Sequence, residues 1–365
     1  MPQIDRREWL LLAAAATFSP LSPVMADTPP LQPIRLALNE NPFGPSPLAI
    51  EAIKADLTGL ARYTGREVEE LTAAIAKHEN IATDQIVLGE NLDVLGLYLS
   101  AHGGPGGGFV YSEPGYTALV DAVAPAGGRV IGVPLNDRLE NDLPAIAAAV
   151  NAGTRAVYLV NPHNPSGTAS EPADFFKAIN ELSRRTLVIV DEAYLEFMPD
   201  FETRTVAGLV RDGANVAVFR TFSKIYGLAS LAIGYTLAPK ALAAALKQIG
   251  IGAFFGLNRL SLVAAAASLR DHDYIGRVRA KVAEEREAWH ALLRARQRRF
   301  SASQVNFVFF DCGRPHAEAA ATLAARGILV GRAQSHFETW LRISIGLPED
   351  NAIARQAVAE LLPPI

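Results

Sequence analysis

The sequence predicts an α/β fold with a doubly wound, mostly parallel sheet and a smaller α+β domain. From about residue 51 to 255, apolar strand patterns alternate with helical patterns, which indicates a parallel sheet covered by helices. Three of the apolar runs lead into Asn164, Asp191 and Lys224, which are 27 and 33 residues apart, each about one strand–helix repeat. Because ligands bind at the carboxyl edge of such sheets, we expect these side chains to share one crevice.

Residues 1–26 are expected to be a twin-arginine signal peptide rather than part of the fold. Arg6 and Arg7 precede an apolar stretch, and Val24-Met25-Ala26 offers small residues for cleavage after Ala26. The apolar stretch is shorter than the roughly 20 residues that span a bilayer. We therefore expect a periplasmic protein with no membrane association after cleavage. The alternative is an ordinary N-terminal helix of a cytoplasmic protein, if the signal is not used.

The remainder of the chain divides into three expected parts. Residues 27–50 are rich in proline and predict an extended N-terminal arm with a gating loop. Residues 51–255 predict the large domain, with strands at 86–88, 108–111, 156–160, 187–190 and 216–219. Residues 256–365 predict a linker helix and a small C-terminal domain, with long helices across 259–299, strands near 305–310 and 341–345, and helices at 316–326 and 349–362.

Composition excludes several kinds of site. The net charge of −4 gives no electrostatic case for nucleic acid, and the single cysteine, Cys312, excludes an intrachain disulfide and a cysteine-rich metal site. His163 has no second histidine or acidic cluster at ligand spacing, so we interpret it as a turn residue. The run Gly103–Gly108 lacks the Lys-Ser/Thr of a nucleotide phosphate loop. The basic run 294–299 is expected to be a solvated helix end.

The strongest chemical signal is Lys224, in the run Thr221-Phe222-Ser223-Lys224. Hydroxyls beside a lysine at a strand end suit a phosphate bound next to a reactive amine, and such an amine forms a Schiff base with an aldehyde cofactor. Asp191 follows four apolar residues, and a buried carboxylate needs a cationic partner or becomes protonated. The alternatives are a solvated surface lysine and a structural salt bridge at Asp191.

Five segments together resemble the fold-type I pyridoxal-phosphate-dependent aminotransferases of class I and II, and within them the histidinol-phosphate aminotransferase branch. In chain order the segments are Leu38–Pro45, Asn161–Thr168, Asp191–Tyr194, Ser223-Lys224 and Leu341–Gly346. The resemblance extends from about residue 35 to 362. It implies that the cofactor is pyridoxal 5′-phosphate, that residues 51–255 bind it, and that the partners are a small amino donor and a keto acceptor.

The resemblance also implies roles for single residues. Lys224 would form the Schiff base and carry the proton. Asp191 would hold the ring nitrogen protonated, so that the ring is an electron sink. Tyr194 and Asn164 would hydrogen-bond the phenolic oxygen of the cofactor and so tune the reaction. The alternatives are a core tyrosine and a turn asparagine. Tyr116 would stack on the cofactor ring. The cofactor phosphate would accept hydrogen bonds from the backbone N–H groups of Leu92 and Asp93 at a helix start, and from the hydroxyls of Thr221 and Ser223.

Further roles concern the substrate and a partner subunit. Arg342 would clamp a carboxylate or phosphate, with a structural ion pair as the alternative, and Arg332 lies one residue away from a second family arginine. Asn39 and Phe43 would line the substrate pocket. Tyr63 matches a tyrosine that reaches the phosphate in the neighbouring subunit, which implies a homodimer with shared active sites; packing is the alternative.

The phosphate-binding segments depart from the family pattern. Relatives carry an arginine eight residues after the lysine, where this chain has Ala232, and the usual small, glycine-rich run reads Gly89-Glu90-Asn91 here. A bidentate arginine contact is one of the stronger hydrogen-bond types. Either another cation substitutes for it, or the cofactor binds more weakly.

The expected activity is ping-pong transamination of an amino acid or related amine. The resemblance implies histidinol phosphate as donor, whereas export would separate the enzyme from histidine biosynthesis and favours an amino acid or related amine outside the cytoplasm. If the signal is not used, histidinol phosphate or an aromatic amino acid is the expected donor. Two alternatives stay open. One is another reaction of the same cofactor, decarboxylation or β-elimination, because Lys224 and Asp191 serve all of them. The other is a periplasmic cofactor-binding protein without activity, which only Ala232 supports.

Overall fold

The fold is taken from a computed structural model that describes residues 33–102, 107–253 and 255–362. Ile34–Ile365 group into one compact unit. The expected signal peptide lies outside the described residues, and so do residues 27–32 of the expected arm. The division of the described chain at residue 255 stays a prediction.

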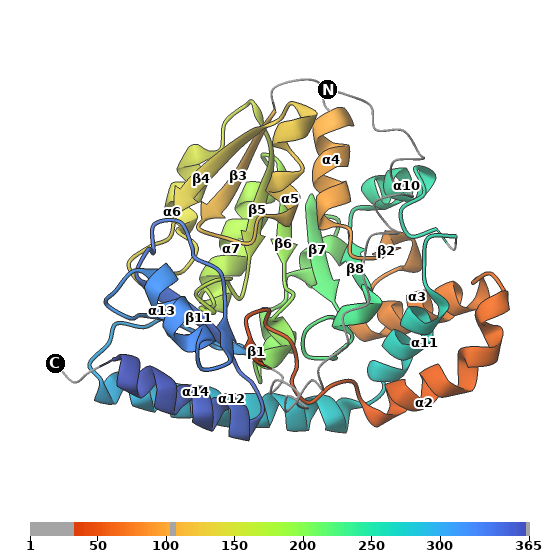
Figure 1. Cartoon of the computed structure of the whole chain (residues 1–365). Coiled ribbons are helices and arrows are strands. Elements are labelled where there is room, and N and C mark those ends of the chain that lie inside the picture. The colour runs from red at the N-terminus through yellow and green to blue at the C-terminus, as the bar shows by residue number, and fades with distance from the viewer. Residues whose placement is uncertain (1–32, 103–106, 254, 363–365) are drawn as a thin grey trace, which may run out of the picture. The chain divides into compact units, whose positions relative to one another are not determined.

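Within the described residues, the central sheet has seven strands in the order β2-β8-β7-β6-β5-β3-β4 (Figure 1). β8 runs antiparallel to both of its neighbours, and the other adjacent pairs are parallel. The mostly parallel sheet and its five predicted strands are confirmed, while β4 and β8 were not predicted. The strands are β2 (Ile86–Leu88), β3 (Gly108–Glu113), β4 (Arg129–Pro134), β5 (Thr154–Val160), β6 (Leu187–Asp191), β7 (Val216–Thr221) and β8 (Gly234–Leu237).

Helices cover both faces of this sheet, as the doubly wound prediction requires. Alternate residues of β5 enter different clusters: Val157 and Leu159 pack on one face, and Tyr158 and Val160 on the other. The Leu159 face is covered by α3 (Arg66–Glu79), α6 (Leu143–Ala149), α7 (Pro172–Ser183) and α9 (Ala207–Arg211). The Tyr158 face is covered by α4 (Leu92–His102), α5 (Ala118–Asp121) and α10 (Lys240–Gln248).

Side-chain caps define where several helices begin. Ser46 accepts the Ala49 N–H at 3.2 Å at the start of α2 (Pro47–Asp56). Asn258 caps α11 (Arg259–Ser268) and Asp271 caps α12 (His272–Ala295) in the same way, in agreement with the helices expected across 259–299. A further short helix is α8 (Phe201–Arg204), and the 3-10 turns of the described residues are η1 (Leu57–Ala61), η2 (Thr83–Gln85), η3 (Ala124–Ala126), η4 (Leu195–Phe197) and η5 (Ala229–Leu231).

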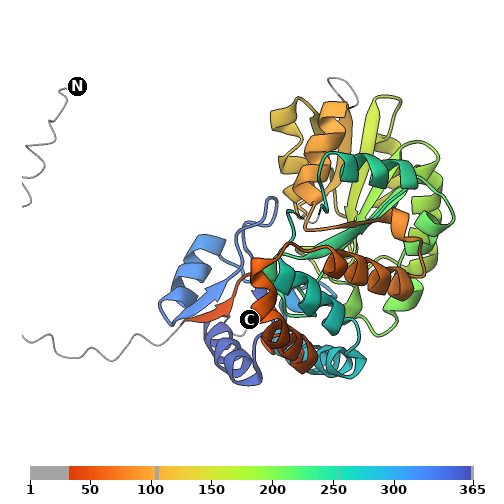
Figure 2. The same ribbon diagram turned by 90° about the vertical axis from the view of Figure 1, so that its right-hand side faces the viewer.

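The C-terminal elements pair with the N-terminal end of the described chain. β9 (Phe307–Asp311) and β11 (Trp340–Ser344) form an antiparallel pair, flanked by α13 (His316–Ala324) and α14 (Pro348–Leu361), all near their predicted positions. A second, unpredicted pair joins β1 (Ile34–Leu36) in parallel to β10 (Ile328–Val330). Figure 2 shows the red β1 beside the blue C-terminal elements. Among the described residues, no helix combines the length and the apolar character needed to cross a bilayer.

Candidate active site

The carboxyl ends of β5, β6 and β7 open into a cleft of about 900 Å³. Val160 pairs with Asp191, and Asp191 with Phe219, so the three strands end side by side. This confirms that Asn164, Asp191 and Lys224 meet at one sheet edge. Ten of the residues predicted for the site line the cleft: Asn39, Tyr116, Asn164, Asp191, Tyr194, Thr221, Ser223, Lys224, Arg332 and Arg342.

Lys224 is presented by a tight loop that follows β7. The Gly227 N–H closes the turn on the Lys224 carbonyl at 2.9 Å. Gly227 has a φ of +73°, and a Cβ there would lie 2.3 Å from the Gly44 carbonyl oxygen, so only glycine allows this close approach. The neighbouring N-terminal loop supplies the Leu38 carbonyl, which accepts a hydrogen bond from Lys224 Nζ at 3.3 Å.

Asp191 is a buried acid without a cationic partner. Its oxygens accept hydrogen bonds from the Tyr158 hydroxyl and the Ala193 N–H, each at 3.0 Å, and no cation lies within 4 Å among the described residues. Burial raises the pKa of Asp191 to about 6, because it outweighs these hydrogen bonds and the field of Lys224. A protonated ring nitrogen would supply the missing positive charge. The site therefore fits the ring of pyridoxal phosphate.

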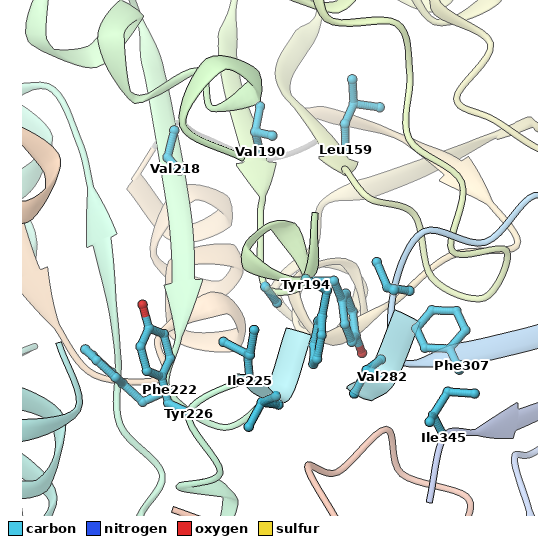
Figure 3. Packing of buried hydrophobic residues seen from close by; sticks show 14 of the residues in the cluster. Leu159, Val190, Tyr194, Val218, Phe222, Ile225, Tyr226, Val282, Phe307 and Ile345 are labelled. Atoms are coloured by element: carbon cyan, nitrogen blue, oxygen red, sulfur yellow. The ribbon is translucent and has the colours of Figure 1, made fainter. Parts of the chain in front are cut away.

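Tyr194 lies in a hydrogen-bond network that leaves its proton available. Its hydroxyl accepts from Asn39 Nδ2 at 3.1 Å and from Asn164 Nδ2 at 3.4 Å, so its own O–H points to another acceptor. Phe307 of β9 packs edge-on against the ring at 5.3 Å, and Figure 3 shows both residues in the buried cluster below the strand ends. Tyr194 is thus held from two sides, and within the part of the chain that the structure describes its O–H donates no hydrogen bond.

Asn39 was predicted to contact the substrate, and the structure also gives it a role in orienting Tyr194. Its backbone N–H donates to Ser344 Oγ at 2.8 Å, and the same hydroxyl donates to Asn39 Oδ1 at 3.0 Å. Asn306 Nδ2 donates to the Asn39 carbonyl at 3.0 Å. Because Oδ1 is an acceptor here, the amide Nδ2 must point to Tyr194.

Arg342 of β11 is a buried cation without an acidic partner. Its guanidinium donates to Asn164 Oδ1 at 2.6 Å and to the Ala37 carbonyl at 2.9 Å, and it makes no salt bridge among the residues that the structure describes. Burial lowers the pKa of Arg342, and the nearby charge of Arg332 acts in the same direction. The alternative of a structural ion pair is therefore not found in the described chain. An anion bound in the cleft would offset the cost of burying this charge.

The opposite end of the cleft holds a carboxyl group. The hydroxyls of Thr221 and Ser223, predicted to bind phosphate, both donate to Glu90 Oε1, that of Ser223 at 2.9 Å. Burial raises the pKa of Glu90. Ala232, at the place of the expected arginine, is exposed with a φ of +46° and does not line the cleft. We call Glu90, Thr221 and Ser223 the phosphate end, and Asp191, Tyr194, Asn164 and Lys224 the ring end.

Four predicted residues do not line the cleft. Leu92 and Asp93 begin α4 as expected, but Leu92 is buried in the core and the Asp93 side chain is exposed, with Oδ1 accepting the Val94 N–H. Phe43 packs against the core with Lys281 4.9 Å above its ring, because its loop turns towards α12. Tyr63 is 80% exposed and borders a separate hollow.

Sequence reasoning also missed two residues of the site. Tyr158 lies in the buried strand β5 and was counted only as an apolar strand residue, although a hydroxyl in such a strand indicates a buried hydrogen bond. Glu90 was noted only as a departure from a glycine-rich run, and its charge in that run was the available signal. His163, interpreted as a turn residue, is fully buried with Nδ1 3.1 Å from Ser166 Oγ, and burial lowers its pKa to about 3.

Comparisons with known proteins agree with this geometry. Residues 32–358 match the family model of aminotransferases of class I and II. The histidinol-phosphate aminotransferase of Limosilactobacillus fermentum is 36% identical over 333 residues, which cover 90% of this chain and 91% of the relative. The aromatic amino acid aminotransferase of Thermobifida fusca is 35% identical and covers 87% of both chains.

Solved structures give the same result. The putative histidinol-phosphate aminotransferase of Erwinia carotovora atroseptica has a TM-score of 0.84 at 30% identity, covering 90% of this chain and 95% of that one. The histidinol-phosphate aminotransferase of Sinorhizobium meliloti, solved in complex with pyridoxal-5′-phosphate, has a TM-score of 0.81 at 32% identity and covers 90% of both chains. The chain therefore belongs to the class I and II aminotransferases, fold-type I enzymes that use pyridoxal phosphate.

Proposed function

We propose that this enzyme transaminates an anionic amino acid or related amine outside the cytoplasm, as a homodimer, by a ping-pong cycle. The observation that carries the substrate class is Arg342, a buried guanidinium with no acidic partner in the described chain. Through Asn164 it is linked to Tyr194, so the anion site and the ring end share one hydrogen-bond network. A bound carboxylate or phosphate would complete that network.

Pyridoxal phosphate, when bound, supplies an aldehyde that bonds to amines and a ring that accepts electrons. Lys224 Nζ would provide the amine that bonds to this aldehyde and, once released, would move the proton at the substrate Cα. Asp191 would hold the ring nitrogen protonated, because its buried carboxyl makes no salt bridge among the residues that the structure describes. The Tyr194 hydroxyl would donate to the phenolic oxygen of the cofactor. Arg342 orients the substrate through its anionic group.

The names of the relatives suggest two donors, histidinol phosphate and aromatic amino acids. Each carries an anionic group, a phosphate or a carboxylate, that a guanidinium binds through two parallel hydrogen bonds. Arg332 lines the same cleft as Arg342, and its charge lowers the pKa of Arg342, so a second cation faces the substrate position. The site supports an anionic donor, and titration with both kinds of donor distinguishes a phosphate from a carboxylate.

The test is a visible absorbance titration of the cofactor-loaded protein with L-amino acids, aromatic amino acids and L-histidinol phosphate. We expect one donor to bleach the yellow colour and a keto acid to restore it. Bleaching by histidinol phosphate alone would assign the phosphate-bearing donor. Turnover that proceeds without a keto acid would contradict transamination and indicate decarboxylation or β-elimination.

Export is supported by the paired Arg6 and Arg7, the apolar stretch after them and the small residues at 24–26. Twin-arginine export carries folded proteins, so the cofactor would be loaded before export. Replacing both arginines with lysine should retain the protein in the cytoplasm. An unchanged distribution between cytoplasmic and periplasmic fractions would contradict this assignment.

A homodimer is supported by exposed apolar side chains around η1. Leu57, Leu60 and Tyr63 are 48%, 55% and 80% exposed, and the Tyr63 ring contacts that of Phe255, which is 70% exposed. A second subunit would bury this surface and could bring Tyr63 to the partner's phosphate end. Sedimentation at micromolar concentration should give a dimer. A monomer with full activity would exclude shared active sites.

A further inference from the structure

The phosphate end of the cleft is already occupied by a side chain of this protein. Glu90 follows β2 and Gly89 and lies across the cleft floor from β7, 131 residues away in sequence from Thr221. Its Oε1 accepts both hydroxyls that the cofactor phosphate would otherwise use. The Glu90 carboxyl packs against Gly234 of β8. A side-chain Cβ at Gly234 would lie 3.4 Å from this carboxyl and 2.6 Å from the Arg220 carbonyl oxygen. The carboxyl is therefore packed into this position.

The charges around Glu90 do not neutralise a second anion. Among the described residues Lys224 is the cation that acts on it, and that amine would also be the group that bonds to the cofactor aldehyde. Asp93 of α4 and Asp191 of β6 are acids that face it, and Tyr116 is the further titratable group. Ala232 supplies no guanidinium. No cation forms a salt bridge with Glu90 among the described residues.

An ionised Glu90 and a phosphate would repel each other at this separation. A phosphate ester carries close to two negative charges at pH 7, and its second pKa is about 6. Two acids that share a buried site cannot both ionise freely, so one proton stays between them. A protonated carboxyl has an O–H to donate to a phosphate oxygen, which an ionised carboxylate lacks.

We propose that Glu90 binds the cofactor phosphate as a neutral carboxylic acid, in place of the missing arginine, so that binding of pyridoxal phosphate takes up a proton. The inference rests on pyridoxal phosphate binding in this cleft and is independent of the substrate. Burial already raises the pKa of Glu90 against the opposing hydrogen bonds from Thr221 and Ser223 and the field of Lys224. Once that carboxyl is ionised, cofactor affinity falls as pH rises, by up to about tenfold per pH unit.

The test is calorimetric titration of the cofactor-free protein at pH 8, in buffers of different ionisation enthalpy, with pyridoxal phosphate and with pyridoxal. Protons exchanged at Lys224 and at the ring are common to both ligands. With pyridoxal phosphate, we expect the wild-type protein to take up about one proton more than the Glu90→Gln variant. With pyridoxal, we expect the two proteins to take up the same number of protons. Glu90→Gln should also bind pyridoxal phosphate at least about tenfold more tightly at pH 8.

Asp121→Asn is the matched control, because Asp121 is a carboxylate on the same cleft wall whose partner is the Thr117 hydroxyl at 2.7 Å. It should leave the proton uptake unchanged. Glu90→Ser is a second variant that removes the charge if the glutamine does not pack, and it should lose the extra proton as well. Equal proton uptake by the wild type and both Glu90 variants would overturn the proposal, and so would an extra proton that appears with pyridoxal. Neither measurement involves an amino substrate, so a failure here is distinct from a failure of the proposed transamination.

Discussion

The two ends of the cleft differ in how closely they follow the family. At the ring end, Asp191, Tyr194, Asn164 and Lys224 lie at neighbouring strand ends and their unpaired groups fit the cofactor ring. At the phosphate end the donors are kept, but a glutamate lies on them and the arginine is absent. Asp191 is fixed by the sheet and the other ring-end residues meet it just beyond adjacent strand ends, whereas the two departures at the phosphate end, Glu90 and Ala232, lie outside the strands and can change separately from the sheet.

The largest effect should come from the ring end, with Lys224→Ala. Loss of the amine removes both the covalent attachment and the proton carrier, so the rate of transamination should fall by at least about 10⁴-fold. Single-turnover bleaching by the donor measures this. Lys54→Ala is the control, because Lys54 is an exposed lysine paired with Glu51. A Lys224→Ala protein with near-normal rates would break the ring-end account.

Asp191→Asn should separate activity from stability. Burial raises the pKa of Asp191 to about 6 in the folded, cofactor-free protein, so its stabilising contribution is complete below about pH 4 and is lost as pH rises through 6. At pH 8 the asparagine variant should therefore be more stable by about 3 kcal/mol, while activity falls by about 10²-fold or more.

Urea unfolding of the cofactor-free proteins at pH 8 and pH 5 checks this prediction. The advantage of the asparagine variant should shrink at pH 5. A variant that is less stable than the wild type at pH 8 would show that Asp191 has a cationic partner in solution.

Arg342→Gln tests the link between the anion site and the ring end. Loss of one charge-assisted contact should lower kcat/KM for the donor by about 10- to 100-fold, with most of the change in KM. Arg332→Gln should have a smaller effect, because Arg332 is exposed at the cleft. Steady-state kinetics with both variants separates the two arginines. An equal loss in both would place the anion between them.

The smallest effect is expected at the phosphate end, with Ala232→Arg. The new guanidinium adds a bidentate contact to the phosphate, but the backbone φ of +46° disfavours any long side chain at this position. The two effects oppose each other, so binding of pyridoxal phosphate should tighten by only about a few-fold. Equilibrium dialysis with pyridoxal phosphate measures the change, with pyridoxal as the insensitive control. Unchanged or weaker affinity would count against placing the phosphate beside this residue.

The strands that sequence predicted were those with long apolar runs. β5, β6 and β7 are buried on both faces and read as continuous apolar runs, which is the signature of central parallel strands. β4 has an exposed and half-buried pattern, and β1 pairs with β10 across almost 300 residues. No local pattern reports such a distant pairing, so these strands were missed.

The residues of the site fall into the same two groups, those that sequence predicted and those that it did not. Residues at the ends of buried strands were placed in the cleft by strand geometry, as Asn164, Asp191 and Lys224 show. Glu90 was not, because its contact with Thr221 joins the loop after β2 to the end of β7, 131 residues away, and no local pattern specifies that approach. Phe43 was assigned to the cleft, yet its loop turns the ring towards Lys281. The direction of a loop side chain depends on tertiary packing, which sequence alone does not specify.

Locating the lysine that carries the cofactor tests whether this cleft is the active site. The protein is incubated with pyridoxal phosphate, reduced with borohydride to fix the covalent bond, digested and analysed by mass spectrometry. We expect one modified peptide, containing Lys224. Modification at another lysine, or none, would contradict the assignment of this cleft as the active site.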